Sequence, residues 1–310
     1  MPTWNITDIP DQTGRTVLIT GANSGLGLAS ARVLAARGAR VLLACRSPER
    51  GRAALEQVRR VGPADLVQLD LSDLSSVRRA AEEIRDRTGD SLDVLMNNAG
   101  VMATPLRRTV DGFELQLGTN HLGHAALTWL LGPALRNGTA PRVVTVSSLS
   151  HRSGRLGLDD LNFERRRYRP GQAYSQSKLA NLLFAFELDR RARARGLDLV
   201  SVAAHPGVVA TELAANTTRS HSDNPTVARV ARFLTHLVSQ PIRRGVLPQL
   251  YAATAPDVRG GDFFGPDGLG EVYGRGVRRA TPSAAAQDPA TAAALWERTA
   301  ELTGVSPYPC

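Results

Sequence analysis

Thr16-Val17-Leu18-Ile19-Thr20-Gly21-Ala22-Asn23-Ser24-Gly25-Leu26-Gly27 is the stretch of the chain that decides its fold. It begins as a short, apolar, β-branched run, which is typical of a buried parallel strand. Three glycines then follow within seven residues, and residues 28–37 show a helical pattern. Glycines let the chain turn tightly and bring backbone N–H groups against a phosphate at the start of a helix. A glycine-rich turn between a strand and a helix therefore predicts a phosphate-binding site.

The rest of the chain repeats this alternation of strands and helices. It predicts an α/β fold, a doubly wound parallel sheet (Rossmann fold) of about seven strands with helices on both faces. A single dinucleotide-binding and catalytic domain would span residues 1–310, with 265–310 as a C-terminal extension. Further strands are expected at 41–45, 66–69, 93–96, 143–146, 199–204 and 261–264, and helices at 50–60, 74–87, 111–136, 173–195, 242–254 and 291–302.

Composition describes an ordinary globular protein. Of its 310 residues, 42% are hydrophobic and 22% are charged, which suits a sizeable core. No apolar run is long enough to span a membrane, and residues 1–12 lack a signal-peptide pattern, so no membrane anchor is expected. The two cysteines cannot build a disulfide framework, which favours a cytoplasmic location.

The net charge of +9 and the pI near 10.6 raise nucleic acid as a partner. The arginines are scattered, however, and no basic stretch carries the interleaved aromatic residues of a single-strand binder. The densest cluster, Arg165-Arg166-Arg167, lies in the connection 149–172, which we interpret as solvated and too polar for the core. We therefore expect no nucleic-acid partner.

Tyr174 and Lys178 form the strongest candidate for acid–base chemistry. Residues four apart on a helix project from the same face, and a cation near a phenol favours the phenolate. Lys178 is the only lysine in the chain, and the other 37 basic residues are arginines. Lysine differs from arginine where a compact charge on a flexible stem is required. A solvated surface lysine is the less favoured interpretation.

The second strand ends on Arg46. An acidic residue at this position would select a ribose 2′-hydroxyl, whereas an arginine accommodates a 2′-phosphate with a bidentate fork. The sequence therefore favours NADP over NAD. Asp70 and Leu71 follow the third strand, at the edge of the sheet where an adenine would rest.

Further candidate site residues follow the fourth, fifth and sixth strands, and one more lies inside an expected helix. Asn97-Asn98-Ala99-Gly100 comes directly after the fourth strand and would let a ring or ribose approach. Asn120 lies inside an expected helix, where asparagine is unfavourable without a purpose. Ser148 lies just past a central strand, where this architecture places its site. We interpret His205, before Pro206-Gly207, as structural rather than catalytic.

Residues 208–240 leave two interpretations open. Residues 210–223 are polar, and Asn224 with Pro225 has the pattern of a helix start. An apolar helical face follows, which belongs either to a lid that closes over a substrate or to a helix packed on the core. We predict a substrate lid. The apolar positions are Val227, Val230, Phe233, Leu234, Leu237 and Val238.

These motifs resemble the short-chain dehydrogenase/reductase family through nearly the whole chain. The glycine spacing is that of its single-domain members, and the asparagine motif at 97–100, Ser148 and the Tyr174/Lys178 pair appear in the expected order. Four features are similar to the retinol dehydrogenase-type branch, namely Ala44-Cys45-Arg46, the long gap between Ser148 and Tyr174, and the motifs at 177–181 and 205–207.

The resemblance implies a role for each catalytic candidate. Tyr174 would be the general acid when a carbonyl is reduced and the base in the reverse direction. Lys178 would bond the nicotinamide ribose, Ser148 would donate to the substrate oxygen, and Asn120 would hold a water behind Lys178. Pro206, Gly207, Val209 and Thr211 match the stretch that holds the nicotinamide carboxamide. The full predicted cofactor set is Gly21, Asn23, Ser24, Gly25, Leu26, Gly27, Arg46, Asp70, Leu71, Asn98, Ala99, Gly100, Tyr174, Lys178, Pro206, Gly207, Val209 and Thr211.

The expected function is an NADP(H)-dependent oxidoreductase that interconverts a carbonyl and an alcohol on a lipophilic or secondary-metabolite substrate. Membrane-bound retinol dehydrogenases carry an apolar N-terminal anchor that residues 1–12 lack, which puts retinoids in doubt. A non-enzymatic NADP-sensing protein is the alternative, and the complete catalytic set argues against it. No metal site is expected, and a homodimer is one alternative for the oligomeric state.

Overall fold

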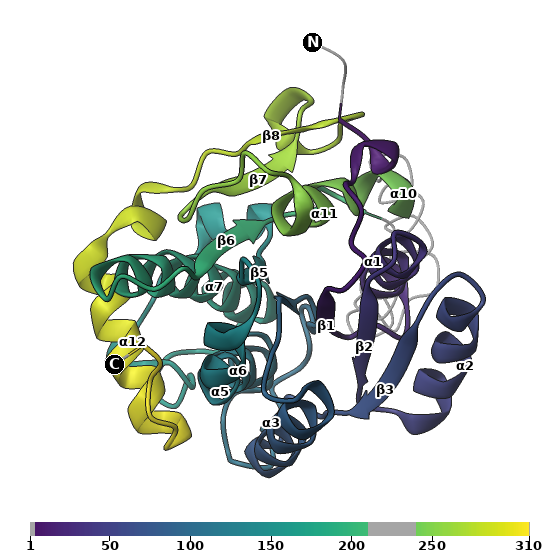
Figure 1. Cartoon of the computed structure of the whole chain (residues 1–310). Helices are drawn as coiled ribbons and strands as arrows, with labels where there is room; N and C mark the ends of the chain where they lie inside the picture. The colour runs from purple at the N-terminus through teal and green to yellow at the C-terminus, as the bar shows by residue number, and fades with distance from the viewer. Residues whose placement is uncertain (1–3, 210–239, 310) are drawn as a thin grey trace, which may run out of the picture.

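The computed structural model describes residues 4–209 and 240–309, and these residues contain one eight-stranded sheet (Figure 1). The strand order is β3-β2-β1-β4-β5-β6-β7-β8, and neighbours run parallel except for the last pair, β7 and β8. This order confirms the predicted doubly wound parallel sheet. The strands are β1 (Thr16–Thr20), β2 (Arg40–Cys45), β3 (Ala64–Gln68), β4 (Val94–Asn97), β5 (Arg142–Val146), β6 (Val200–Ala204), β7 (Phe263–Pro266) and β8 (Val277–Arg279).

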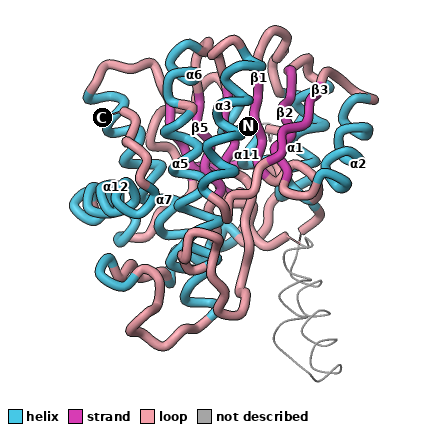
Figure 2. Tube along the Cα trace, turned by 90° about the horizontal axis from the view of Figure 1, so that it is seen from below, coloured by secondary structure: helices cyan, strands magenta, loops and turns pink. Residues whose placement is uncertain are grey.

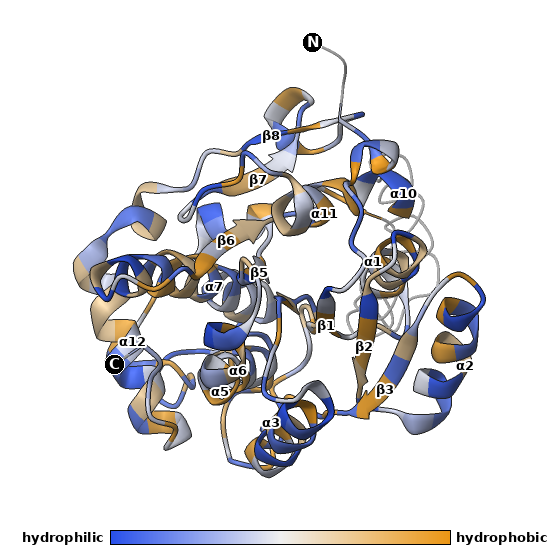
Figure 3. Cartoon of the chain, in the orientation of Figure 1, coloured by the Kyte–Doolittle hydropathy of each residue, from blue (hydrophilic) through white to orange (hydrophobic). Residues whose placement is uncertain are grey.

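The central strands consist of continuous apolar runs because helices cover both faces of the sheet. Val17 of β1 pairs with Val41 of β2 on one side and with Val94 of β4 on the other, and all three side chains are buried. In Figure 3 β2 and β6 carry mainly the hydrophobic colours, whereas α2 and α3 show both blue and orange, as helices with one buried face do.

Helices cover the sheet in two layers, with the strands between them (Figure 2). Neighbouring strand residues point to opposite faces, so Ile19 packs in the layer with α1, α2 and α11, whereas Leu18 packs in the layer with α3, α5 and α7. The helices are α1 (Gly25–Ala36), α2 (Pro48–Arg59), α3 (Leu74–Thr88), α4 (Leu115–Leu117), α5 (Gly123–Leu130), α6 (Gly132–Asn137), α7 (Pro170–Ala194), α10 (Ile242–Gly245), α11 (Leu247–Thr254) and α12 (Pro289–Thr303). None of these helices combines the length and apolar character needed to cross a bilayer within the described ranges.

The prediction of one continuous helix at residues 111–136 is wrong, both in where the helix begins and in its continuity. It begins at Leu115, because Gly112 adopts a turn with a φ of +86°. A π-helical turn, Gly118–Leu122, then separates α4 from α5. A second break separates α5 from α6, and Pro133, which lacks an N–H group, stands in the first turn of α6. The segment that carries Asn120 is therefore locally widened.

The connection at residues 149–172 also differs from the prediction, because part of it belongs to the core. Leu161 and Phe163 are only 4% and 5% exposed. The Asp160 carboxylate accepts backbone N–H groups from Glu164 and Arg166, so this loop satisfies its polar groups internally. Side-chain-to-backbone bonds of this kind let a polar sequence be buried.

The C-terminal part of the chain extends the sheet and covers α7. The expected helix at 242–254 is divided into α10 and α11, and β8 adds an antiparallel edge strand that the sequence pattern did not reveal. Trp296 of α12 stacks on Phe184 of α7 with their ring centroids 5.4 Å apart. Asp288 caps α12, which begins at Pro289 as a first-turn proline does.

Candidate active site

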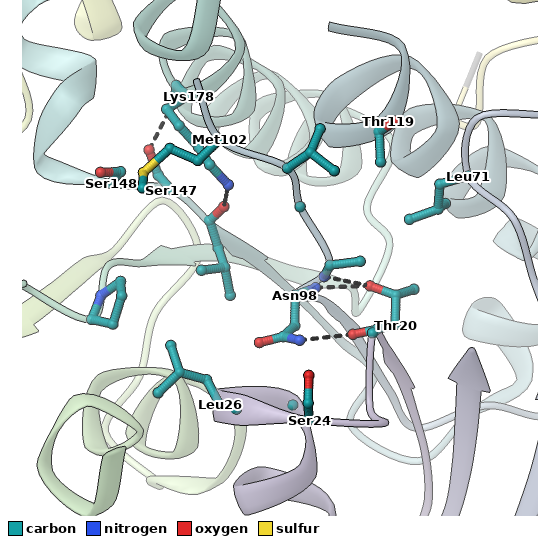
Figure 4. A pocket seen from close by; sticks show the side chains of 18 of the residues that line it. Thr20, Ser24, Leu26, Leu71, Asn98, Met102, Thr119, Ser147, Ser148 and Lys178 are labelled. Atoms are coloured by element: carbon teal, nitrogen blue, oxygen red, sulfur yellow. Dashed lines mark hydrogen bonds between the residues drawn. The ribbon is translucent and has the colours of Figure 1, made fainter. Parts of the chain in front are cut away.

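The order of the strands reverses at β1, which lies between β2 and β4. In open parallel sheets, ligands bind at the carboxyl ends of the strands where the order reverses. A cavity of about 520 Å³ opens at this edge of the molecule. Figure 4 shows Ser148 and Lys178 on one side of the cavity and Thr20, Ser24 and Leu26 across from them.

The turn after β1 requires its glycines. Gly21 has a φ of +66°, in the left-handed region that L side chains rarely adopt. A Cβ atom at Gly27 would lie 2.5 Å from the Gly21 carbonyl oxygen and 2.6 Å from Asn98 Nδ2. The turn is therefore tight enough to place the start of α1 at the cavity, where its first N–H groups are available to an anion.

Thr20 ties the ends of β1 and β4 together. Its Oγ1 accepts N–H groups from Asn98 and Ala99, each at 2.9 Å, and its carbonyl oxygen accepts Asn98 Nδ2 at 2.8 Å (Figure 4). Both N–H groups are thus directed into the protein, and the backbone after β4 is fixed next to the glycine turn.

The β2 and β3 side of the cavity is polar and open to solvent. Arg46 and Arg50 are both exposed and both line it, together with Asp70 and Leu71. Asp70 Oδ1 accepts the N–H and hydroxyl of Ser72, which fixes its carboxylate. Two guanidinium groups here provide two forks for an anionic group.

Tyr174 and Lys178 lie in the second and third turns of α7 and are 8% and 4% exposed. Lys178 Nζ donates to the Val146 carbonyl oxygen at 3.0 Å and lies 5.8 Å from the centre of the Tyr174 ring. Burial lowers the pKa of Lys178 to about 8. Burial raises the pKa of Tyr174 to about 12, against an opposing effect of the Ser148 hydroxyl. At neutral pH Tyr174 is therefore protonated, and Lys178 carries a charge that is easily lost.

Ser148 follows β5 and caps a short helix, Leu149–Ser153. Its Oγ accepts the Ser150 N–H at 3.2 Å and donates to Ser150 Oγ at 3.3 Å. The neighbouring Ser147 Oγ donates to the Lys178 carbonyl oxygen at 2.8 Å, which joins the end of β5 to α7. Ser148 and Lys178 are therefore held by the same junction.

Asn120 lies behind the cavity rather than in its lining. Its side chain is fully buried, with Oδ1 accepting the Val101 N–H at 2.8 Å and Nδ2 donating to the Val101 carbonyl and to Ser177 Oγ, each at 2.9 Å. A Cβ atom at Gly100 would lie 3.2 Å from Asn120 Oδ1 and 3.6 Å from Lys178 Nζ. Asn120 and Lys178 thus flank the same glycine.

The structure brings most of the predicted site residues to one cavity. Thr211 lies outside the described residues, as does the predicted lid apart from its first two residues and its last. Asn120 packs one layer behind. The predicted residues that line the cavity are Gly21, Asn23, Ser24, Gly25, Leu26, Gly27, Arg46, Asp70, Leu71, Asn98, Ala99, Gly100, Ser148, Tyr174, Lys178, Pro206, Gly207 and Val209.

The cavity lining also includes residues that the sequence did not predict, among them Arg50, Met102, Thr119 and Leu149. Arg50 carried a signal, because Ser47-Pro48 predicts a helix start that places residue 50 in its first turn. Met102 lies in a loop and Leu149 begins the short helix after Ser148, and neither apolar residue carried a signal. Thr119 lines the cavity with its Oγ1 buried and without a hydrogen-bond partner in the described ranges.

Comparison with known proteins assigns this doubly wound α/β chain to a family. The family described as short chain dehydrogenase matches residues 15–222. The chain belongs to the short-chain dehydrogenase family. Its similarity to human retinol dehydrogenase 13 is 38% identity over 94% of this chain and 85% of that protein. The predicted family and its retinol dehydrogenase-like branch are confirmed.

Two solved structures extend the comparison to the fold. An uncharacterised protein from Mycobacterium paratuberculosis is 45% identical with a TM-score of 0.80, covering 100% of both chains. A structure described as an NAD(P)-dependent gluconate 5-dehydrogenase from Beutenbergia cavernae, with bound NADP, is 25% identical with a TM-score of 0.63. That match covers 81% of this chain and 94% of the other.

Proposed function

We propose that the protein is an NADP(H)-dependent oxidoreductase that interconverts a carbonyl and an alcohol on a lipophilic or secondary-metabolite substrate. The observation that carries this proposal is the convergence of Ser148, Tyr174 and Lys178 on one side of a cavity whose other side holds Arg46. The family name supports the oxidoreductase class.

The residues of the cavity fit a nicotinamide dinucleotide. The tight glycine turn and the start of α1 would hold its pyrophosphate, and Arg46 and Arg50 would hold a 2′-phosphate. β2 and β5 are three strand positions apart, or about 14 Å, which suits an extended ligand. The relative with bound NADP supports the same choice. When bound, the cofactor supplies or accepts the hydride.

Tyr174 is the proposed proton donor for carbonyl reduction. A pKa of about 12 keeps its hydroxyl protonated at neutral pH, which is the form that a donor requires. Positioned proton transfer of this kind contributes about 10²–10⁴ in rate. Ser148 Oγ would donate a hydrogen bond to the same substrate oxygen, where negative charge develops.

Lys178 and Asn120 would support Tyr174 from behind. The charge of Lys178 favours the phenolate that remains after proton transfer, and its stem is fixed by the bond to the Val146 carbonyl. Lys178 would also hold the ribose next to the nicotinamide. Asn120 would hold a water that returns a proton toward Lys178.

Apolar side chains support a lipophilic substrate. Val101, Met102 and Leu149 line the cavity together with Ser148. Pockets of this kind take their affinity from apolar contact and their orientation from a few polar groups. Retinol, the alcohol in the name of the human relative, is itself apolar, which agrees with this class of substrate.

A turnover screen tests the proposal. NADPH oxidation is followed with a series of apolar aldehydes and ketones, and the series is repeated with NADH. We expect turnover that depends on Tyr174 and a preference for NADPH. Tight NADPH binding without turnover of any carbonyl or alcohol would favour the NADP-sensing alternative instead.

A further inference from the structure

Glu271 is a buried carboxylate outside the cavity lining. Its side chain is 4% exposed, and it ends the short 3₁₀ helix Leu269–Glu271 in the connection between β7 and β8. Its φ is +63°, in the left-handed region that a residue with a side chain rarely adopts. A buried charge requires partners, and a strained backbone persists only where its surroundings hold it. The partners of Glu271 therefore indicate what this connection does.

The first partner, Arg152, connects Glu271 to the part of the cavity lining that holds Ser148, here called the Ser148 wall. Arg152 donates to Glu271 Oε2 at 2.7 Å, and Arg152 belongs to the short helix that begins directly after Ser148. The same helix is fixed a second time by His151, whose Nδ1 donates to the Ser148 carbonyl oxygen at 2.6 Å and whose Nε2 accepts the Ser283 N–H at 3.2 Å. Glu271 thus anchors the segment that positions the Ser148 hydroxyl.

The second partner, His205, connects Glu271 to Gly207 at another part of the cavity lining, here called the Gly207 wall. His205 Nδ1 accepts the Gly207 N–H at 3.2 Å, so the proton of the neutral ring is on Nε2, which donates to Glu271 Oε2 at 3.2 Å. A Cβ atom at Gly265 would lie 2.2 Å from His205 Nε2, so glycine leaves the space that this ring orientation needs. Glu271 thus also fixes Gly207, which lines the cavity with Pro206.

The remaining contacts keep Glu271 charged. Oε1 accepts the Thr281 N–H at 3.1 Å and lies 3.7 Å from Arg278. Burial acts to raise the pKa of Glu271, but the hydrogen bonds from His205 and Thr281 and the charge of Arg152 outweigh it and lower the pKa. One carboxylate therefore holds an arginine and a histidine from two different walls.

We propose that Glu271 is a positioning residue that couples the Ser148 wall to the Gly207 wall through Arg152 and His205. It contacts neither substrate nor cofactor. The role rests on the proposed function, in which Ser148 binds the substrate oxygen and Gly207 faces the nicotinamide. Fixing both walls to one anion keeps the substrate carbonyl and the nicotinamide in register, which hydride transfer requires.

Glu271→Gln tests this role, with Glu187→Gln as a matched control. Glu187 is 1% exposed and binds two arginines, Arg190 and Arg191, but it lies about 20 Å along α7 from Tyr174. Two probes are titrated against each variant, NADP⁺ and 2′-phospho-ADP-ribose, which lacks the nicotinamide. We expect Glu271→Gln to reduce the preference for NADP⁺ over the shorter probe about tenfold, because the variant loosens Gly207 and only NADP⁺ carries the nicotinamide that would lie against it. Glu187→Gln should keep the wild-type preference.

Turnover supplies the second readout. Glu271→Gln should lower kcat about tenfold, and Arg152→Gln should lower kcat while keeping the probe preference. Arg152 is half-exposed, so this variant still tests the serine arm if Glu271→Gln fails to fold. Wild-type probe preference and kcat in Glu271→Gln, or equal changes in Glu187→Gln, would overturn the proposal. If the wild type binds NADP⁺ but reduces no carbonyl, the proposed function fails, whereas the probe preference still decides the coupling of Glu271 to Gly207.

Discussion

Tyr174 and Lys178 at one side of the cavity are 8% and 4% exposed, whereas Arg46 and Arg50 at the other side are exposed to solvent. The buried pair lies on a long helix, α7, which is joined to the end of β5 by hydrogen bonds from Lys178 Nζ and Ser147 Oγ to backbone carbonyl oxygens. The exposed pair follows β2, and in the proposed function it would act through charge in a high-dielectric environment. We therefore expect substitutions at the buried side to act through shape and desolvation. Substitutions at the exposed side should act through a charge that water and salt weaken.

The largest effect is expected at the buried side, from Tyr174→Phe. The ring and its packing remain, but the variant removes the proton that Tyr174 is proposed to deliver. The kcat for carbonyl reduction should fall about 10² or more, with NADPH affinity and melting temperature close to wild type. A variant that keeps even a third of wild-type kcat would show that another group donates the proton.

Lys178→Arg tests whether the buried side tolerates a change of shape at constant charge. Lys178 Nζ is buried against the Val146 carbonyl, and a planar guanidinium is too large to reproduce this contact and a ribose contact together. We expect kcat to fall about tenfold or more and NADPH binding to weaken. The reverse exchange at an exposed site, Arg60→Lys, is the control and should keep full activity. Wild-type kinetics for Lys178→Arg would mean that the lone lysine is an accident of composition.

Arg46→Asp addresses the exposed side. It removes one fork for a 2′-phosphate and introduces the acid that a ribose 2′-hydroxyl prefers. The ratio of NADH to NADPH dissociation constants, measured by fluorescence titration, should fall about tenfold, the value of one exposed charge-assisted contact. Arg52→Asp makes the same charge change on α2 away from the cavity lining and should leave the ratio unchanged. Equal dissociation constants in the wild type would refute the preference itself.

The smallest effect is a pH dependence of stability. The folded pKa of Lys178 is about 8, below its ordinary value of 10.5, so between these values the unfolded chain holds a proton that the folded chain has lost. Stability from this residue therefore rises with pH through that window, and below pH 8 the buried charge opposes folding. Lys178→Met should have its largest gain in melting temperature over wild type below pH 8, with the gain shrinking toward pH 10. A gain independent of pH would show that Lys178 is not desolvated.

The parts of the molecule that the sequence predicted are those with local signals. β1, its glycine turn and α1 follow from one apolar run and three glycines, and the Tyr174/Lys178 spacing places two side chains on one face wherever a helix forms. The strand ends that carry Ser148 and Asn98 could be found because parallel strands end at one edge of the sheet.

Other features depend on contacts between distant segments and left no local pattern. β8 is a three-residue Val-Arg-Arg strand that exists through its pairing with β7. Leu161 and Phe163 are buried although their neighbours are polar, because Asp160 satisfies the local backbone. Glu271 stands among glycines and arginines, and only the folded chain brings it to Arg152 and His205.

The single lysine has a practical consequence for chemical labelling. Apart from the α-amino group, Lys178 carries the only primary amine of the chain, and its lowered pKa makes part of it nucleophilic near pH 8. Acylating or reductively methylating reagents would therefore modify one side chain at one internal position. Incorporation at Lys178, followed by mass spectrometry, would report directly whether a small molecule shields the interior of the protein, without any knowledge of what it turns over.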